Sequence, residues 1–166
     1  MSIDNLTELY IDQLQDLYSA NRQSLEATKA LRGAATSGDL KTALDAGVTG
    51  IEDGMTSVKT LIENHKADPT GEFCKGMEGL VKEAKAHAIN ADISDLDTRD
   101  ASIIAQYQRM AHYAMAGYGT AAAFAERLGL EEDAAVLRKN LEDTKGGDAR
   151  MTGIAIGTVN EEAMAA

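Results

Sequence analysis

The sequence predicts an all-α fold, a bundle of four long helices, and two observations carry that prediction. The composition favours helices, because the 166 residues include one proline, no tryptophan and two phenylalanines, and proline is by far the poorest helix former. Apolar side chains also recur every three or four residues through most of the chain, and no stretch alternates as a strand does. A chain of this length has the size of one domain, so we expect residues 1–166 to form a single domain.

Loop-forming residues divide the chain into five helical segments. Glycine, proline and small polar residues gather at 33–39, 65–72, 90–100 and 129–133. The segments between them are 3–32, 39–64, 73–89, 98–128 and 131–160. Helices of about 25–30 residues are about 40 Å long, and short connections make neighbours antiparallel. The short 73–89 segment falls inside the long connection between the second and fourth segments, and one long crossover is typical of ferritin-like bundles.

The first segment shows its buried face through Leu6, Tyr10, Leu14 and Leu17, spaced by three and four residues. The same face continues to Asn21, a polar residue at a core position. We expect Asn21 to pair with a polar neighbour such as Thr49 or Thr144, with contact to a bound ligand as the alternative.

The second segment begins after Ser37, a residue type that caps helices. Gly47, Gly50 and Gly54 share one face of it, and each costs up to about 1 kcal/mol of helix stability relative to alanine. Close helix packing, including packing across a dimer interface, would offset this cost, and room for a ligand is the other explanation. The apolar positions of the segment are Leu40, Leu44, Ile51, Met55, Val58 and Leu61.

The fourth and fifth segments complete the bundle. Thr98 is the expected cap of the fourth, with Asp100 in the first turn, where a negative charge suits the helix dipole. Its apolar residues include Ile104, Tyr107, Met110, Ala111, Ala114, Met115, Tyr118, Ala122 and Phe124. The fifth segment places Ala134, Leu137, Leu141, Thr144, Met151, Ile154 and Ala155 at core spacing.

Charge and cysteine content exclude several classes of protein. The formal net charge of −11 argues against binding to nucleic acid or to an anionic membrane surface, both of which need clustered basic residues. No apolar run is long enough to span a membrane, and the N-terminal residues do not read as a secretory signal. A single cysteine, Cys74, forms no intramolecular disulfide, and it is expected to be an ordinary packed residue. We therefore expect a cytoplasmic protein.

Several short motifs resemble one known family over nearly the whole chain. They are "LYSA" (17–20), "CKGMEGL" (74–80) followed by Glu83, "DASII" (100–104), Gln108, "HY" (112–113), "YGT" (118–120), "LG" (128–129), Leu137, Leu141, Glu142 and Asp148. In this order and spacing they are similar to the YciF/YciE family of bacterial stress-induced ferritin-like proteins. The resemblance implies a ferritin-like bundle, a homodimer and, in most relatives, a carboxylate-rich dinuclear metal site in the bundle core.

The sequence departs from the family where the metal ligands are expected. Such sites use one glutamate from each of two helices and a Glu-x-x-His pair from each of the other two. Relatives place a glutamate after "LYSA", a Glu-x-x-His pair on the second helix, glutamates on both sides of "HY" and a glutamate run on the last helix. This chain instead has Asn21, Thr49, Glu52, Ala111, Ala114, Glu142, Asp143 and Thr144 at those positions.

The loss is concerted, and it favours a protein without the metal site. An unpaired buried carboxylate is costly, so ligands become liabilities once the metal is gone. We expect no cofactor and a structural or small-molecule-binding role rather than an enzyme. The positions of the vestigial site or pocket are Asn21, Thr49, Gly50, Glu52, Ala111, His112, Ala114, Thr144 and Asp148.

Two readings with a cofactor stay open. The first is an iron or manganese oxidase or catalase-like enzyme with an unusual ligand set, drawn from Glu52, His112, Glu142, Asp143 and Asp148. The second is a haem bundle that uses His112 with a methionine such as Met115. Against both, we expect His112 to be a partly buried histidine that hydrogen-bonds to a neighbouring helix, and the methionines to fill gaps in the core.

Overall fold

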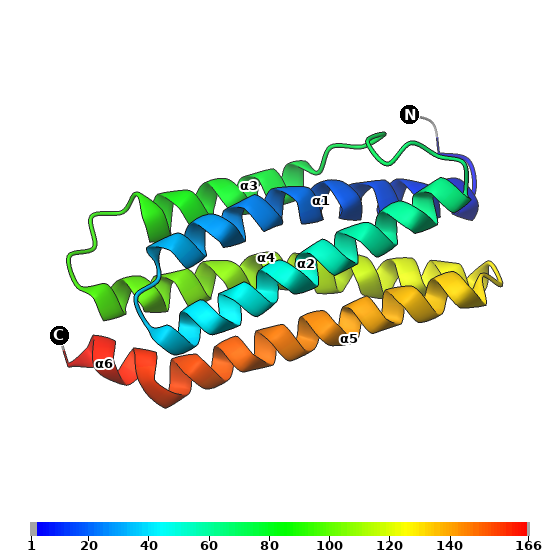
Figure 1. The fold of residues 1–166 in the computed structure, drawn as a ribbon. Helices are drawn as coiled ribbons and strands as arrows, with labels where there is room; N and C mark the ends of the chain where they lie inside the picture. Colours follow the sequence, from blue (N-terminus) through cyan, green and yellow to red (C-terminus); the bar gives the residue numbers. More distant parts are fainter. Residues whose placement is uncertain (1–2, 166) are drawn as a thin grey trace.

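The computed structural model describes residues 3–165 and shows four long helices packed side by side (Figure 1). They are α1 (Leu6–Ala34), α2 (Gly38–Asn64), α4 (Leu96–Arg127) and α5 (Glu131–Ile154). Helix α1 packs against α2 and α4, and α5 packs against α4 and α2. No strand occurs among the described residues. The prediction of an all-α bundle is confirmed.

The connection between α2 and α4 crosses the length of the bundle. Helix α3 (Lys75–Ala84), continued by a π-helical turn at Lys85–Ile89, runs back along α1 before α4 begins (Figure 1). This matches the short helix expected in the crossover. As a result α2 and α4 point in the same direction, whereas α2 and its neighbour α5 are antiparallel, and so are α1 and its neighbour α4.

The last helical segment is less continuous than its periodicity suggests. Helix α5 ends at Ile154, a π-helical turn spans Ala155–Val159, and a short helix, α6, covers Asn160–Met164. In a π-helical turn each N–H donates to the carbonyl five residues earlier instead of four, which interrupts the α-helical hydrogen-bond ladder. The prediction of one continuous helix over 131–160 was therefore only partly right.

Caps explain where the first two long helices begin. The Asn5 side chain accepts a hydrogen bond from the Glu8 N–H at 2.9 Å and starts α1. Ser37 caps α2 as predicted, since its hydroxyl accepts from the Leu40 N–H at 3.4 Å.

The start of α4 differs from the prediction. The cap is Asp95, whose Oδ1 accepts from the Thr98 N–H at 2.7 Å. Thr98 is thus inside the helix, and the prediction that it caps α4 was wrong.

Asp100 likewise has a different role from the one expected. It is fully buried rather than placed in the first turn beside the helix dipole. Its carboxylate accepts hydrogen bonds from the Thr36 N–H (2.9 Å), the Thr36 hydroxyl (2.7 Å) and the Ser37 N–H (2.6 Å). Asp100 therefore fastens the turn between α1 and α2 onto α4.

The apolar core falls into two clusters along the bundle axis. One includes Tyr10, Leu14, Leu17, Val58 and Ile62. The other includes Leu31, Leu40, Leu44, Met77 and Ile103. No helix in the described part of the chain is long and apolar enough to cross a membrane.

Candidate functional site

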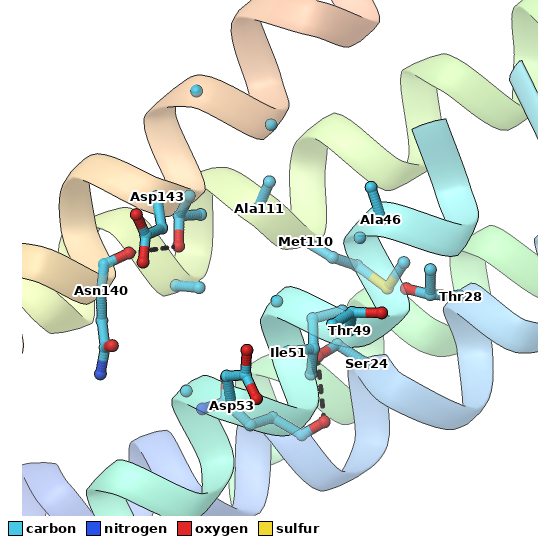
Figure 2. A pocket seen from close by; sticks show the side chains of 18 of the residues that line it. Ser24, Thr28, Ala46, Thr49, Ile51, Asp53, Met110, Ala111, Asn140 and Asp143 are labelled. Carbon is cyan, nitrogen blue, oxygen red and sulfur yellow. Dashed lines mark hydrogen bonds between the residues drawn. The ribbon is translucent and has the colours of Figure 1, made fainter. Parts of the chain in front are cut away.

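A cavity of about 600 Å³ lies in the middle of the bundle and opens beside α2 and α5 (Figure 2). All four long helices contribute to its wall. Six of the predicted site positions line it, namely Asn21, Thr49, Gly50, Ala111, Ala114 and Thr144. The structure thus brings together six of the nine positions predicted for a vestigial metal site or pocket.

Two tyrosines from α4 reach across the bundle to the glycine face of α2. A Cβ atom on Gly47 would lie 2.7 Å from the Tyr107 hydroxyl oxygen, and one on Gly54 would lie 2.6 Å from the Tyr118 hydroxyl oxygen. These two glycines therefore permit close packing, as predicted, but the contact is within the chain. Gly50 has no atom within 4 Å of an added Cβ and borders the cavity. At that position the alternative explanation, that the glycine leaves room for a ligand, fits better.

Asn21 and Tyr118 form a buried polar pair on the cavity wall. The Asn21 Nδ2 donates to the Tyr118 hydroxyl at 2.8 Å, and the two residues are 3% exposed. Asn21 is buried and paired as the periodicity predicts, but its partner is Tyr118 rather than Thr49 or Thr144, so that detail was wrong. Burial raises the pKa of Tyr118 to about 12, and the bond from Asn21 opposes the increase.

Thr49 and Thr144 satisfy their hydroxyls locally instead. The Thr49 hydroxyl donates to the Asp45 carbonyl at 3.3 Å, and the Thr144 hydroxyl donates to the Asn140 carbonyl at 2.7 Å. Both are bonds to the preceding helical turn, which is a common arrangement for threonine within a helix. The two residues therefore shape the cavity wall without an unmet polar group.

The charged side chains of the cavity lie at its mouth. Asp53 comes from α2, and Lys139, Glu142, Asp143 and Arg150 come from α5. All five are solvent-exposed. Figure 2 shows Asp53 and Asp143 on different helices beside the opening.

Two of the mouth carboxylates have cationic partners on their own helix. Lys139 bonds to Asp143, and Lys145 bonds to Glu142 at 2.7 Å. These exposed ion pairs contribute little to stability, but they direct the two carboxylates along α5.

His112 lies outside the cavity. Its side chain is 64% exposed, and its Nε2 is 3.2 Å from the Asp148 Oδ1 on α5. The predicted contact with a neighbouring helix is present, but the predicted burial was wrong. Asp148 also accepts from the Gln108 Nε2 at 3.0 Å. Met115, the partner in the haem reading, does not line the cavity either.

The residues present do not fit a dinuclear metal centre. Glu52 lies on the exposed side of α2 with its Oε1 3.4 Å from the Lys29 Nζ. His112 and Asp148 pair with each other away from the cavity, while Glu142 and Asp143 pair with lysines. Within residues 3–165 no group of three His, Cys, Asp or Glu side chains is placed to hold a metal ion. The ligand set proposed for iron or manganese is therefore not brought together.

Cys74 belongs to a separate, partly buried network. Its thiol is 2.9 Å from the Tyr113 hydroxyl, which in turn donates to Asp16 Oδ2 at 2.9 Å. Cys74 is 1% exposed, and burial raises the pKa of its thiol although the Tyr113 contact opposes this. The geometry is that of a packed cysteine, as predicted.

Sequence reasoning missed Thr28 as a site residue. It lies seven positions after Asn21 on the same face of α1, lines the cavity and is fully buried. The spacing could have placed it beside Asn21. Tyr107 and Tyr118 were assigned to the core. Their contacts with Gly47 and Gly54 on α2 could not be predicted from the sequence, because they depend on how α2 and α4 pack.

Comparisons with known proteins agree with this architecture. The chain is 31% identical to the protein YciF of Escherichia coli K12 over 164 residues, which cover 98% of both proteins. The crystal structure of that E. coli stress protein matches with a TM-score of 0.89 over 96% of this chain and 99% of its own chain. The structure of YcfI from Rhodopseudomonas palustris matches with a TM-score of 0.85 at 29% identity, over 91% of this chain and 95% of its own. Residues 5–164 match the family model described as a domain of unknown function, DUF892, and the chain belongs to that family.

Proposed function

We propose that this chain is a ferritin-like, stress-associated protein that has lost the dinuclear metal site and binds a small molecule in the mid-bundle cavity without catalysing a reaction. The observation that carries the proposal is the cavity itself, which is lined by six of the nine positions predicted for a vestigial metal site or pocket. The stress association rests on the E. coli relative, whose crystal structure is described as that of a stress protein.

The size and chemistry of the cavity support binding. Small-molecule sites are concave, largely apolar, about 300–1,000 Å³ in volume and carry a few placed polar groups. This cavity has about 600 Å³. Alanines and glycines make up much of the wall, and Asn21, Thr28 and Tyr107 supply buried polar groups.

The same lining supports a role other than catalysis. None of the described residues around the cavity is a histidine or a cysteine, the side chains that most often serve as general base or nucleophile. The three carboxylates of the lining, Asp53, Glu142 and Asp143, are exposed at the mouth rather than buried on the inner wall.

A cavity-filling variant tests the proposal. Gly50→Leu adds a side chain where nothing lies within 4 Å of the new Cβ, so it occupies the cavity without a backbone clash. The matched control is Gly153→Leu on α5, because Gly153 is also helical, exposed and without close neighbours but does not line the cavity. Both changes remove a glycine from a helix, and both should raise stability by similar amounts.

The readout is a ligand-observed NMR screen of small neutral and charged organic fragments against the three proteins. We expect fragments that bind the wild type and Gly153→Leu and that lose binding in Gly50→Leu. Binding that is equal in all three proteins places the fragments elsewhere, and a screen without hits on the wild type removes the small-molecule function.

A further inference from the structure

Thr28 carries a buried hydroxyl without a partner on the inner wall of the cavity. The residue is fully buried, and within residues 3–165 its Oγ1 has no hydrogen-bond partner. Thr49 and Thr144 on the same cavity each bond to a carbonyl one turn earlier, so Thr28 differs from its neighbours. A buried hydroxyl left unpaired costs about 1–3 kcal/mol, and a ligand that supplies the missing bond recovers that cost.

Tyr107 supplies a second polar group on the cavity wall. It is 8% exposed and lines the cavity, and no hydrogen bond to its hydroxyl occurs in the described part of the chain. Burial raises its pKa, and the nearby Asp148 carboxylate raises it further. The hydroxyl therefore stays protonated and can both donate and accept.

Part of the cavity wall is apolar and formed by small side chains. Ala43, Ala46, Ala111 and Ala114 face it together with Met110. In the view of Figure 2, Met110 extends from α4 toward the side of the cavity where Thr28 lies. An unbranched methionine adapts its shape readily, so Met110 can move to admit a ligand atom to Thr28.

The charge around the cavity disfavours anions. The three carboxylates at the mouth and the basic residues beside them are all exposed, and Lys139 and Lys145 pair with Asp143 and Glu142, so the mouth offers no excess of positive charge to an anion. Asp148 adds a negative potential near Tyr107, and the whole chain carries a formal charge of −11. No basic side chain lies on the inner wall among the residues that line the cavity.

From these observations, and resting on the proposed function, we infer that the cavity takes an uncharged, largely apolar molecule with a hydroxyl or carbonyl oxygen that hydrogen-bonds to Thr28. Tyr107 provides a second contact for a ligand that carries another oxygen. The apolar body lies against the alanine-lined part of the wall, and an organic acid would find no basic partner on the inner wall.

Three probes of similar shape separate the chemical classes. They are 2-naphthol, which has the hydroxyl; 2-methylnaphthalene, which replaces it by a methyl group; and 2-naphthoate, which is an anion. Affinities are measured by NMR titration against the wild type, Thr28→Val and Thr144→Val. Thr144→Val is the matched control, because its hydroxyl is already satisfied by the Asn140 carbonyl.

We expect 2-naphthol to bind the wild type with a dissociation constant below about 1 mM and about tenfold more tightly than 2-methylnaphthalene. The preference should disappear in Thr28→Val and persist in Thr144→Val, and 2-naphthoate should bind least well. Thr28→Val should also raise the thermal midpoint of the ligand-free protein, because it removes an unpaired hydroxyl. A purely structural Thr28 would not alter the preference between the two neutral probes.

The outcomes distinguish this inference from the proposed function. If the neutral probes bind equally, if their difference survives in Thr28→Val, or if 2-naphthoate binds best, the ligand class is wrong. In those cases the cavity still binds small molecules, provided that Gly50→Leu abolishes binding. If none of the probes binds the wild type, the ligand class fails, and the fragment screen then decides whether the proposed function fails with it.

Discussion

Two glycines one turn apart on α2 should respond to alanine in opposite directions. Gly54 is buried, and its Cβ position lies 2.6 Å from the Tyr118 hydroxyl oxygen, whereas Gly50 is exposed and has nothing within 4 Å. Alanine in a helix is favoured over glycine by about 1 kcal/mol. Gly50→Ala should therefore stabilise the protein by about 0.5–1 kcal/mol.

The steric cost at Gly54 outweighs that gain. Tyr118 is 3% exposed and holds the Asn21 amide at 2.8 Å, so its ring cannot move without loss. Overpacking costs about 1–3 kcal/mol, and weakening the buried bond to Asn21 costs about 1–3 kcal/mol more. After the gain in helix propensity, Gly54→Ala should destabilise the protein by about 1–5 kcal/mol.

Urea unfolding followed by far-UV circular dichroism measures both free energies. A double-mutant cycle with Tyr118→Phe isolates the contact. Without the hydroxyl, the nearest ring atom of residue 118 is 3.6 Å from the added Cβ, an ordinary contact. Gly54→Ala should thus cost much less in the Tyr118→Phe background. The reasoning is refuted if Gly54→Ala is as stable as Gly50→Ala, or if its cost is unchanged in that background.

Three further outcomes follow from buried polar groups. Asp100→Asn should lower the free energy of unfolding by about 2–3 kcal/mol, because charge-assisted bonds to the turn between α1 and α2 are lost; urea unfolding checks this, and a loss below about 0.5 kcal/mol would count against the role given to Asp100. Burial stabilises the neutral form of Tyr118 and raises its pKa from about 10 in the unfolded chain to about 12 in the folded protein. The contribution of the neutral Tyr118 side chain to the free energy of unfolding is fully present below about pH 10 and is lost as the pH rises from about 10 to 12. The decline in stability at alkaline pH should therefore be shallower in Tyr118→Phe. Cys74 should react with iodoacetamide only on unfolding, since the thiol is buried and its pKa is raised; rapid labelling of the native protein would contradict its placement.

Much of the fold could be predicted from the sequence, because periodic apolar residues report the buried face of a helix directly. The start of α4 could not, since Asp95 and Thr98 are both capping residue types and lie three positions apart. Which of them caps depends on the path of the preceding loop. The role of Asp100 could not be predicted from the sequence either, because its hydrogen-bond partners lie 63 and 64 residues away in the chain.

The candidate site was predictable in part. Asn21, Ala111 and Ala114 fall on inward-facing positions, and the structure places them on one cavity. His112 follows Ala111 directly, so it is rotated about 100° around the helix from that face. This rotation was sufficient reason to expect it outside. The unpaired hydroxyl of Thr28 could not be predicted, because hydrogen-bond satisfaction depends on the positions of all neighbouring atoms.

The central claim of the proposed function is that the mid-bundle cavity is a small-molecule site and not a dinuclear metal centre. Elemental analysis of the wild-type protein tests it most directly, after incubation with excess iron(II) and manganese(II) under anaerobic conditions and removal of free metal. The account predicts far less than one metal ion per chain, because Glu52, His112, Glu142, Asp143 and Asp148 are not gathered around one point. Two tightly held metal ions per chain would contradict it.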